Sequence, residues 1–206
     1  MSPPDLRSQP MPRRRLTRDE SQARTRAELL RAASRLFLRD GYAATSLAAI
    51  AEEAAVTKGA VYSNFESKED LFLALLRERP AEWYAPRDVS TAVGDEADDR
   101  AEAFGRYAAG RQPSRRHVAL FLEMNAAALR SDRVRRWVAT HNAEFFESLG
   151  SELAEALGVE VDDPGTLGLV TQSLYVGLTM HGAFDGGIDD DRFAEAYRLL
   201  AGLAIR

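Results

Sequence analysis

The stretch TKGAVYSN, residues 57–64, gathers side chains that can form hydrogen bonds to DNA. Lys58 can contact a phosphate or a guanine, and Asn64 can pair with adenine through two hydrogen bonds. The hydroxyl of Tyr62 suits a phosphate oxygen, and Gly59 lets a backbone approach closely. These residue types predict recognition of a nucleic acid rather than catalysis.

Residues 45–65 supply the elements that must hold this stretch in place. They read as two short helices separated by the residues AAV, which is the pattern of a helix-turn-helix. The apolar residues that can form one small core with the preceding helix are Leu47, Ile50, Ala51, Val56, Ala60, Val61 and Phe65. That packing leaves outside Thr57, Lys58, Gly59, Tyr62, Ser63 and Asn64. In this motif the second helix enters the major groove with its N-terminal residues on base edges.

Capping residues mark the helix ends in this region. A first helix starts at about Thr17, carries an apolar stripe, and ends at Gly41. The predicted N-caps of the next three helices are Thr45 or Ser46, Thr57 and Ser67. The fourth helix covers residues 67–79.

The rest of the chain is also predicted to be helical, because no long alternating β-branched run occurs. The predicted helices cover residues 95–109, 114–129, 132–157, 165–184 and 191–205, and the acidic, proline-containing segment 85–99 is predicted to contain a loop. The expected fold class is therefore all-α, with about nine helices.

Charge is divided unevenly along the 206 residues. Residues 1–79 hold 14 basic against 11 acidic side chains, whereas residues 80–206 hold 13 against 21, within an overall net charge of −5. Nine arginines fall between residues 12 and 39. This asymmetry favours a nucleic-acid-binding N-terminal part, with a solvated basic helix face as the alternative.

The first 15 residues are predicted to be a flexible arm, because prolines and arginines cannot bury enough apolar surface to fold. Arg13, Arg14 and Arg15 could lie along DNA, and an inert solubilising tail is the alternative.

Composition also predicts the compartment. The chain has no cysteine, which suits the reducing cytoplasm, and its N-terminus lacks the apolar run of a signal peptide. Residues 167–184 carry no formal charge, but their Thr, Gln, Ser and His side chains favour a buried helix over a membrane span.

One longer stretch, GYAATSLAAIAEEAAVTKGAVYSNFESKEDLF, resembles the DNA-binding domain of the tetracycline-repressor (TetR) family. The likeness covers roughly residues 20–76. It includes a glycine-aromatic pair, a Thr-Ser cap, an Ile-Ala pair, a Val-Thr-Lys-Gly turn, a Val-Tyr-x-x-Phe recognition helix and a Ser-Lys-Glu-x-Leu helix start.

The resemblance implies DNA-contacting positions in this chain. They are Thr45, Ser46, Thr57, Lys58, Gly59, Ala60, Tyr62, Ser63, Asn64 and Lys68. Many family members carry a larger aromatic residue or histidine at positions 63 and 64, so no operator preference is carried over. The family plan implies an arm over 1–15, a DNA-binding domain over 16–66 and a helical ligand-binding and dimerising domain over 67–206.

A small, largely apolar effector is expected to bind inside the C-terminal domain, between its helices. The candidate lining residues are Phe104, Tyr107, Phe121, Met124, Asn125, Trp137, His141, Phe145, Gln172 and Tyr175. Aromatic residues at helical spacing also suit an ordinary filled core, which is the alternative. His141 and Glu144 could form half of a metal site, but no second pair accompanies them, so neither a metal nor another cofactor is predicted.

These features predict a cytoplasmic, homodimeric, one-component transcriptional repressor that binds a pseudo-palindromic DNA operator and is released by its effector. It is predicted not to be an enzyme and not to bind membranes. The alternatives are a helical-bundle small-molecule binding protein or enzyme with no DNA role, and a binding protein whose helix-turn-helix no longer reads DNA.

Overall fold

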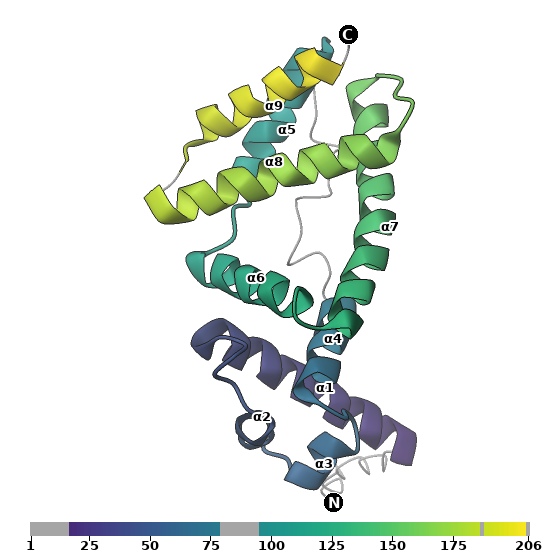
Figure 1. Cartoon of the computed structure of the whole chain (residues 1–206), viewed down its shortest axis with the longest axis vertical. Coiled ribbons are helices and arrows are strands. Elements are labelled where there is room, and N and C mark those ends of the chain that lie inside the picture. The colour runs from purple at the N-terminus through teal and green to yellow at the C-terminus, as the bar shows by residue number, and fades with distance from the viewer. Residues whose placement is uncertain (1–16, 79–94, 186–187, 205–206) are drawn as a thin grey trace, which may run out of the picture.

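A computed structural model describes residues 17–78, 95–185 and 188–204 (Figure 1). Within these ranges the chain forms nine α-helices and no strand, as the sequence predicts. None of the described helices has the length and apolar composition needed to cross a membrane. The predicted arm, residues 1–15, and most of the predicted loop lie outside the described residues.

The first three helices begin where the capping residues predict, and the first also ends at the predicted Gly41. They are α1 (Arg18–Asp40), α2 (Leu47–Glu53) and α3 (Lys58–Tyr62). Thr17 caps α1 through a capping box, and Gly41 ends it with φ +86°. Of the two candidates for the cap of α2, Ser46 is the one that accepts the backbone N–H of Ala49.

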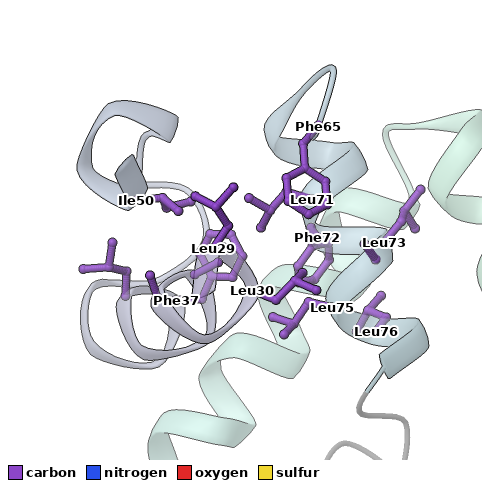
Figure 2. Packing of buried hydrophobic residues seen from close by; sticks show 14 of the residues in the cluster. Leu29, Leu30, Phe37, Ile50, Phe65, Leu71, Phe72, Leu73, Leu75 and Leu76 are labelled. Atoms are coloured by element: carbon purple, nitrogen blue, oxygen red, sulfur yellow. The ribbon is translucent and has the colours of Figure 1, made fainter. Parts of the chain in front are cut away.

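Helix α4 (Lys68–Glu78) completes the core of these three helices (Figure 2). Ser67 caps it by accepting the N–H of Asp70 at 3.0 Å. The six residues from Leu71 to Leu76 are all buried. They belong to what we call the N-terminal core, which comprises Leu29, Leu30, Ala32, Ala33, Leu36, Phe37, Ile50, Ala51, Val61, Phe65, Leu71–Leu76, Leu120, Met124, Ala128, Val134 and Trp137.

The remaining helices are α5 (Ala97–Ala109), α6 (Arg115–Ala128), α7 (Asp132–Leu157), α8 (Pro164–Asp185) and α9 (Asp190–Ala204). Helix α5 packs mainly on α9, and α7 packs mainly on α8 (Figure 1). Buried residues of α5, α7, α8 and α9 form a C-terminal core, which comprises Ala101, Phe104, Ala108, Ala109, Leu153, Ala154, Leu157, Leu167, Tyr175, Phe193, Tyr197 and Ala201. Helix α6 contacts α1, α7 and α8, and its buried residues Leu120, Met124 and Ala128 join the N-terminal core.

Two glycines let α7 and α8 cross with their backbones in contact. A Cβ atom on Gly150 would overlap the carbonyl oxygen of Pro164, and one on Gly168 would overlap the carbonyl oxygen of Phe146. Any larger residue at either position would force the two helices apart.

The turn between α2 and α3 contains a residue in a left-handed conformation. Ala55 has φ +54°, a region that a side chain disfavours because Cβ approaches the following carbonyl oxygen. This conformation reverses the chain so that α3 can pack beside α2.

Ala55→Val should lower the free energy of unfolding by about 1–3 kcal/mol, because a β-branched side chain strains a left-handed backbone. Ala55→Gly should stay within about 1 kcal/mol of wild type, since relief of the Cβ contact offsets the entropy of glycine. Urea unfolding measures both. Ala48→Val, at an exposed position inside α2, is the control and should cost less than about 1 kcal/mol; equal losses in the two valine variants would contradict the role of Ala55.

Candidate DNA-binding interface

Helix α3 lies on the surface over two buried anchors. Val61 and Phe65 are each 1% exposed and belong to the N-terminal core, whereas Tyr62 is 62% exposed. Lys58, Gly59 and Ser63 are also exposed, and Ala60 and Asn64 are half-buried. Of the outward set predicted from the sequence, Thr57, Lys58, Gly59, Tyr62 and Ser63 are exposed, and Asn64 is half-buried.

Two predicted contact residues cap helices at this surface. Thr57 Oγ1 accepts the N–H of Ala60 at 3.2 Å, and Ser46 Oγ accepts the N–H of Ala49 at 3.1 Å. Both residues are exposed. Because each hydroxyl acts as an acceptor within the cap, its own proton remains available to a phosphate oxygen.

Two other predicted contact residues point into the protein. Thr45 is 4% exposed, and its hydroxyl donates to the carbonyl of Gly41 at 2.8 Å. Lys68 Nζ donates to the carbonyls of Tyr42, Ala43 and Thr45 at 2.8, 3.2 and 2.9 Å. It also lies 4.5 Å from the centre of the Tyr42 ring, and burial lowers its pKa. The donors of Thr45 and Lys68 therefore hold the turn between α1 and α2 rather than face solvent.

Ser63 and Asn64 bond to the helix that carries them. Ser63 Oγ donates to the Ala60 carbonyl at 3.0 Å, and Asn64 Nδ2 donates to the same oxygen at 2.8 Å. Pairing of Asn64 with adenine would use the second N–H of its amide and its carbonyl oxygen.

The N-terminal half of α1 forms a wall beside α3 that the sequence analysis did not predict. An open groove of about 390 Å³ is lined by Asp19, Gln22, Ala23, Arg26, Ser63 and Asn64. A neighbouring groove of about 330 Å³ is lined by Arg18, Ser21, Gln22, Thr25, Ala60, Ser63 and Asn64. The arginine-rich composition of residues 12–39 was the available signal, but it does not say which side chains face α3.

The predicted effector-binding residues do not form one group. Met124 and Trp137 lie in the N-terminal core and Phe121 packs against it, while Phe104 and Tyr175 lie in the C-terminal core and Tyr107 packs against that one. Phe145 and Gln172 are buried, and Asn125 is exposed. Phe104 lines a cavity of about 10 Å³, which is the size of one water molecule.

Trp137 is a buried donor without an acceptor. The residue is 8% exposed, and its Nε1 has no hydrogen-bond partner among the residues that the structure describes. The ring of His141 stacks on the indole at a centroid distance of 3.8 Å, and His141 Nδ1 lies 3.0 Å from the Trp137 carbonyl oxygen. In the described part of the chain, no three His, Asp or Glu side chains gather closely enough to hold a metal ion.

The sequence of this region is similar to that of known proteins. Residues 29–75 match the profile described as "Bacterial regulatory proteins, tetR family". The HTH-type transcriptional regulator TtgR of Pseudomonas putida is 50% identical over 62 residues, 30% of this chain and 29% of TtgR. The HTH-type transcriptional regulator AcrR of Shigella flexneri is 48% identical over 58 residues, 28% of this chain and 26% of AcrR. The match thus spans less than a third of the length of either curated relative.

Structural comparison extends the likeness to the whole fold. A putative TetR-family transcriptional regulator from Mesorhizobium loti superposes with a TM-score of 0.66 and 19% identity, over 91% of this chain and 96% of that one. By its matching residues 29–75, the N-terminal part of the chain belongs to the TetR family of bacterial regulatory proteins, and the helices of the whole chain are arranged as in this neighbour.

Proposed function

We propose that the protein is a cytoplasmic transcriptional repressor that binds a pseudo-palindromic DNA operator as a homodimer. The observation that carries this proposal is the exposed face of α3, where Lys58, Gly59, Tyr62 and Ser63 stand over the buried anchors of the helix. A short polar helix fixed in this way fits the major groove.

The groups around α3 suit the two kinds of contact that DNA requires. The cap hydroxyls of Ser46 and Thr57 can donate to phosphates, which sets the position of the helix on the duplex. Lys58, Ser63 and Asn64 are placed to meet base edges or neighbouring phosphates. The grooves beside α3 add Arg18 and Gln22 of α1 to the proposed interface.

Positive charge on α1 is largely compensated within the protein. Arg24 pairs with Glu28 at 2.8 Å, Arg35 with Glu53 at 2.9 Å, and Arg39 with Asp40 at 2.8 Å. We therefore propose that Arg13, Arg14 and Arg15 of the arm supply part of the charge that attracts the DNA backbone.

Dimerisation is proposed through α8 and α9. Four of the large apolar side chains that remain exposed lie on these helices: Leu169, Val170, Phe184 and Leu199, with exposures of 45%, 41%, 66% and 55%. Two-fold closure would cover them and is the commonest symmetry of soluble oligomers. It would place the two α3 helices about 34–36 Å apart, or a multiple of that distance.

An effector is proposed to bind near Trp137, where α7 meets α4 and α6 in the N-terminal core. A buried N–H without an acceptor is costly, and a ligand that presents an oxygen or nitrogen acceptor would remove that cost. Because α4 belongs to the same core, a ligand that favours a different position of α4 would weaken DNA binding by its differential affinity.

The protein should be a dimer by light scattering at micromolar concentration and should retard DNA taken from upstream of its own gene. Phe184→Glu with Leu199→Glu should yield monomers that bind this DNA weakly, because buried charges oppose the apolar contact. Leu129→Glu, at a leucine that is 80% exposed at the end of α6, is the control and should stay dimeric. A wild-type protein that is a monomer, or a dimer that retards no DNA, would contradict the proposal.

The chain has two lysines, and the same substitution at each provides a test and its control. Lys58→Met should reduce the slope of log affinity against log salt by about 0.9, the contribution of one phosphate contact, and leave the free energy of unfolding unchanged. Lys68→Met should instead lower the free energy of unfolding by about 1–2 kcal/mol, because three carbonyls lose their donor, and leave the slope unchanged. Salt titrations and urea unfolding of both variants separate these roles, and a reduced slope in Lys68→Met would show that Lys68 contacts phosphate after all.

A screen for small molecules that raise the melting temperature of the protein can supply candidate ligands. For each such ligand, calorimetry should give affinities for the free and the operator-bound protein that differ by about 5–150-fold. The same factor must appear in DNA affinity with and without that ligand. Trp137→Phe should weaken the ligand about tenfold, and Tyr175→Phe, which removes a hydroxyl from the C-terminal core, should not. Equal ligand affinity in free and DNA-bound protein would exclude this mechanism of release.

A further inference from the structure

We propose that Glu123 of α6 is a positioning residue for the helix-turn-helix, acting through the turn between α1 and α2. This inference rests on the proposed DNA-binding function and names a residue outside the DNA-contacting surface that the function depends on. The turn, residues 41–46, leads directly into α2, so its position sets where α2 and α3 stand relative to α6.

The contact joins a carboxylate to a backbone amide across 80 residues of sequence. The N–H of Ala43 donates to Glu123 Oε2 at 2.9 Å. The same carboxylate closes over Gly41, where an added Cβ would lie 2.6 Å from Glu123 Oε1. Glycine at position 41 therefore supplies both the positive φ that ends α1 and the space that the carboxylate occupies.

Lys68 of α4 holds the same turn through the opposite kind of group. Its ammonium binds three carbonyl oxygens of the turn, while the carboxylate of Glu123 binds one amide. Both side chains bind the backbone of Ala43, and the charge of Glu123 opposes the lowering of the Lys68 pKa by burial. A cation on carbonyls and an anion on an N–H both match the polarity of the peptide group.

These two tethers come from different helices. A shift of either α4 or α6 relative to α1 would move the turn, and Ser46, the cap of α2, stands three residues after Ala43. The structure thus gives α6 a connection to the helix-turn-helix that does not pass through α4. This connection consists of one hydrogen bond at an exposed position, so its loss should change position more than stability.

Four variants test the proposal by fluorescence anisotropy on a duplex that the wild type selects from a random-sequence library. Glu123→Ala loses the acceptor, and Glu123→Asp places it one carbon short. Each should bind the duplex roughly tenfold more weakly than the wild type does. Glu123→Gln keeps an oxygen for the Ala43 N–H and should bind within about threefold of wild type. Glu155→Ala, which removes an exposed carboxylate from the far end of α7, should bind like wild type. These changes correspond to about 1.4 kcal/mol per factor of ten.

The sign of the change distinguishes positioning from simple repulsion of DNA. If the charge of Glu123 only repelled phosphates, both Glu123→Ala and Glu123→Gln would bind more tightly than wild type, and the proposal would fall. Binding is measured well below the melting temperature of each variant, so that loss of folded protein does not contribute. If Glu123→Ala does not fold, the comparison of Glu123→Asp with Glu123→Gln decides, and equal affinities in these two would overturn the inference.

The failure of this inference differs from failure of the proposed function. A wild type that selects no duplex overturns both, because there is then no DNA binding to position. If the wild type binds its duplex, and Glu123→Ala and Glu123→Asp bind it at least as tightly, only the inference is overturned.

Discussion

The structure depends on the burial of α4 on all sides. The residues from Leu71 to Leu76 are all buried, which an amphipathic surface helix cannot achieve because successive residues point around the full circumference. Helix α1 meets α4 on one side, and α7 meets it on another (Figure 1). The ion pair of Arg133 with Asp70 at 2.8 Å adds a polar contact between α7 and α4. The two halves of the chain therefore share a hydrophobic core and not only a covalent connection.

Apolar contacts with this shared core orient the helix-turn-helix. Val61 and Phe65 fix α3 against the core, and the cap residues fix where α2 and α3 start. The turn between α1 and α2 lies at the edge of the core, where backbone groups would otherwise depend on water. Lys68 and Glu123 bind those groups, which ties the turn to α4 and α6.

The helices and their caps could be predicted from the sequence because the interactions that set them are local. Thr17, Ser46, Thr57 and Ser67 each bind an N–H three residues ahead. The inward positions of Lys68 and Thr45 could not be predicted, since they depend on how α4 packs beside the α1–α2 turn. Periodicity identified inward-facing aromatic residues of the C-terminal region correctly, yet it does not say which core each one enters. The predicted effector-binding set consequently divides between two cores. The contact of Glu123 joins groups 80 residues apart and leaves no local pattern.

The glycines at the crossing of α7 and α8 restrict how the molecule can deform. Where backbone touches backbone, sliding one helix past the other requires atoms to overlap, so Gly150 and Gly168 make the two helices one lever. A lever of this kind turns as a unit, and its motion is taken up by neighbours that meet it through side chains, whose rotamers can readjust. Helices α4 and α6 are such neighbours of α7. They are also the helices that carry Lys68 and Glu123, so rotation of the lever would reach the turn before α2 from two directions at once.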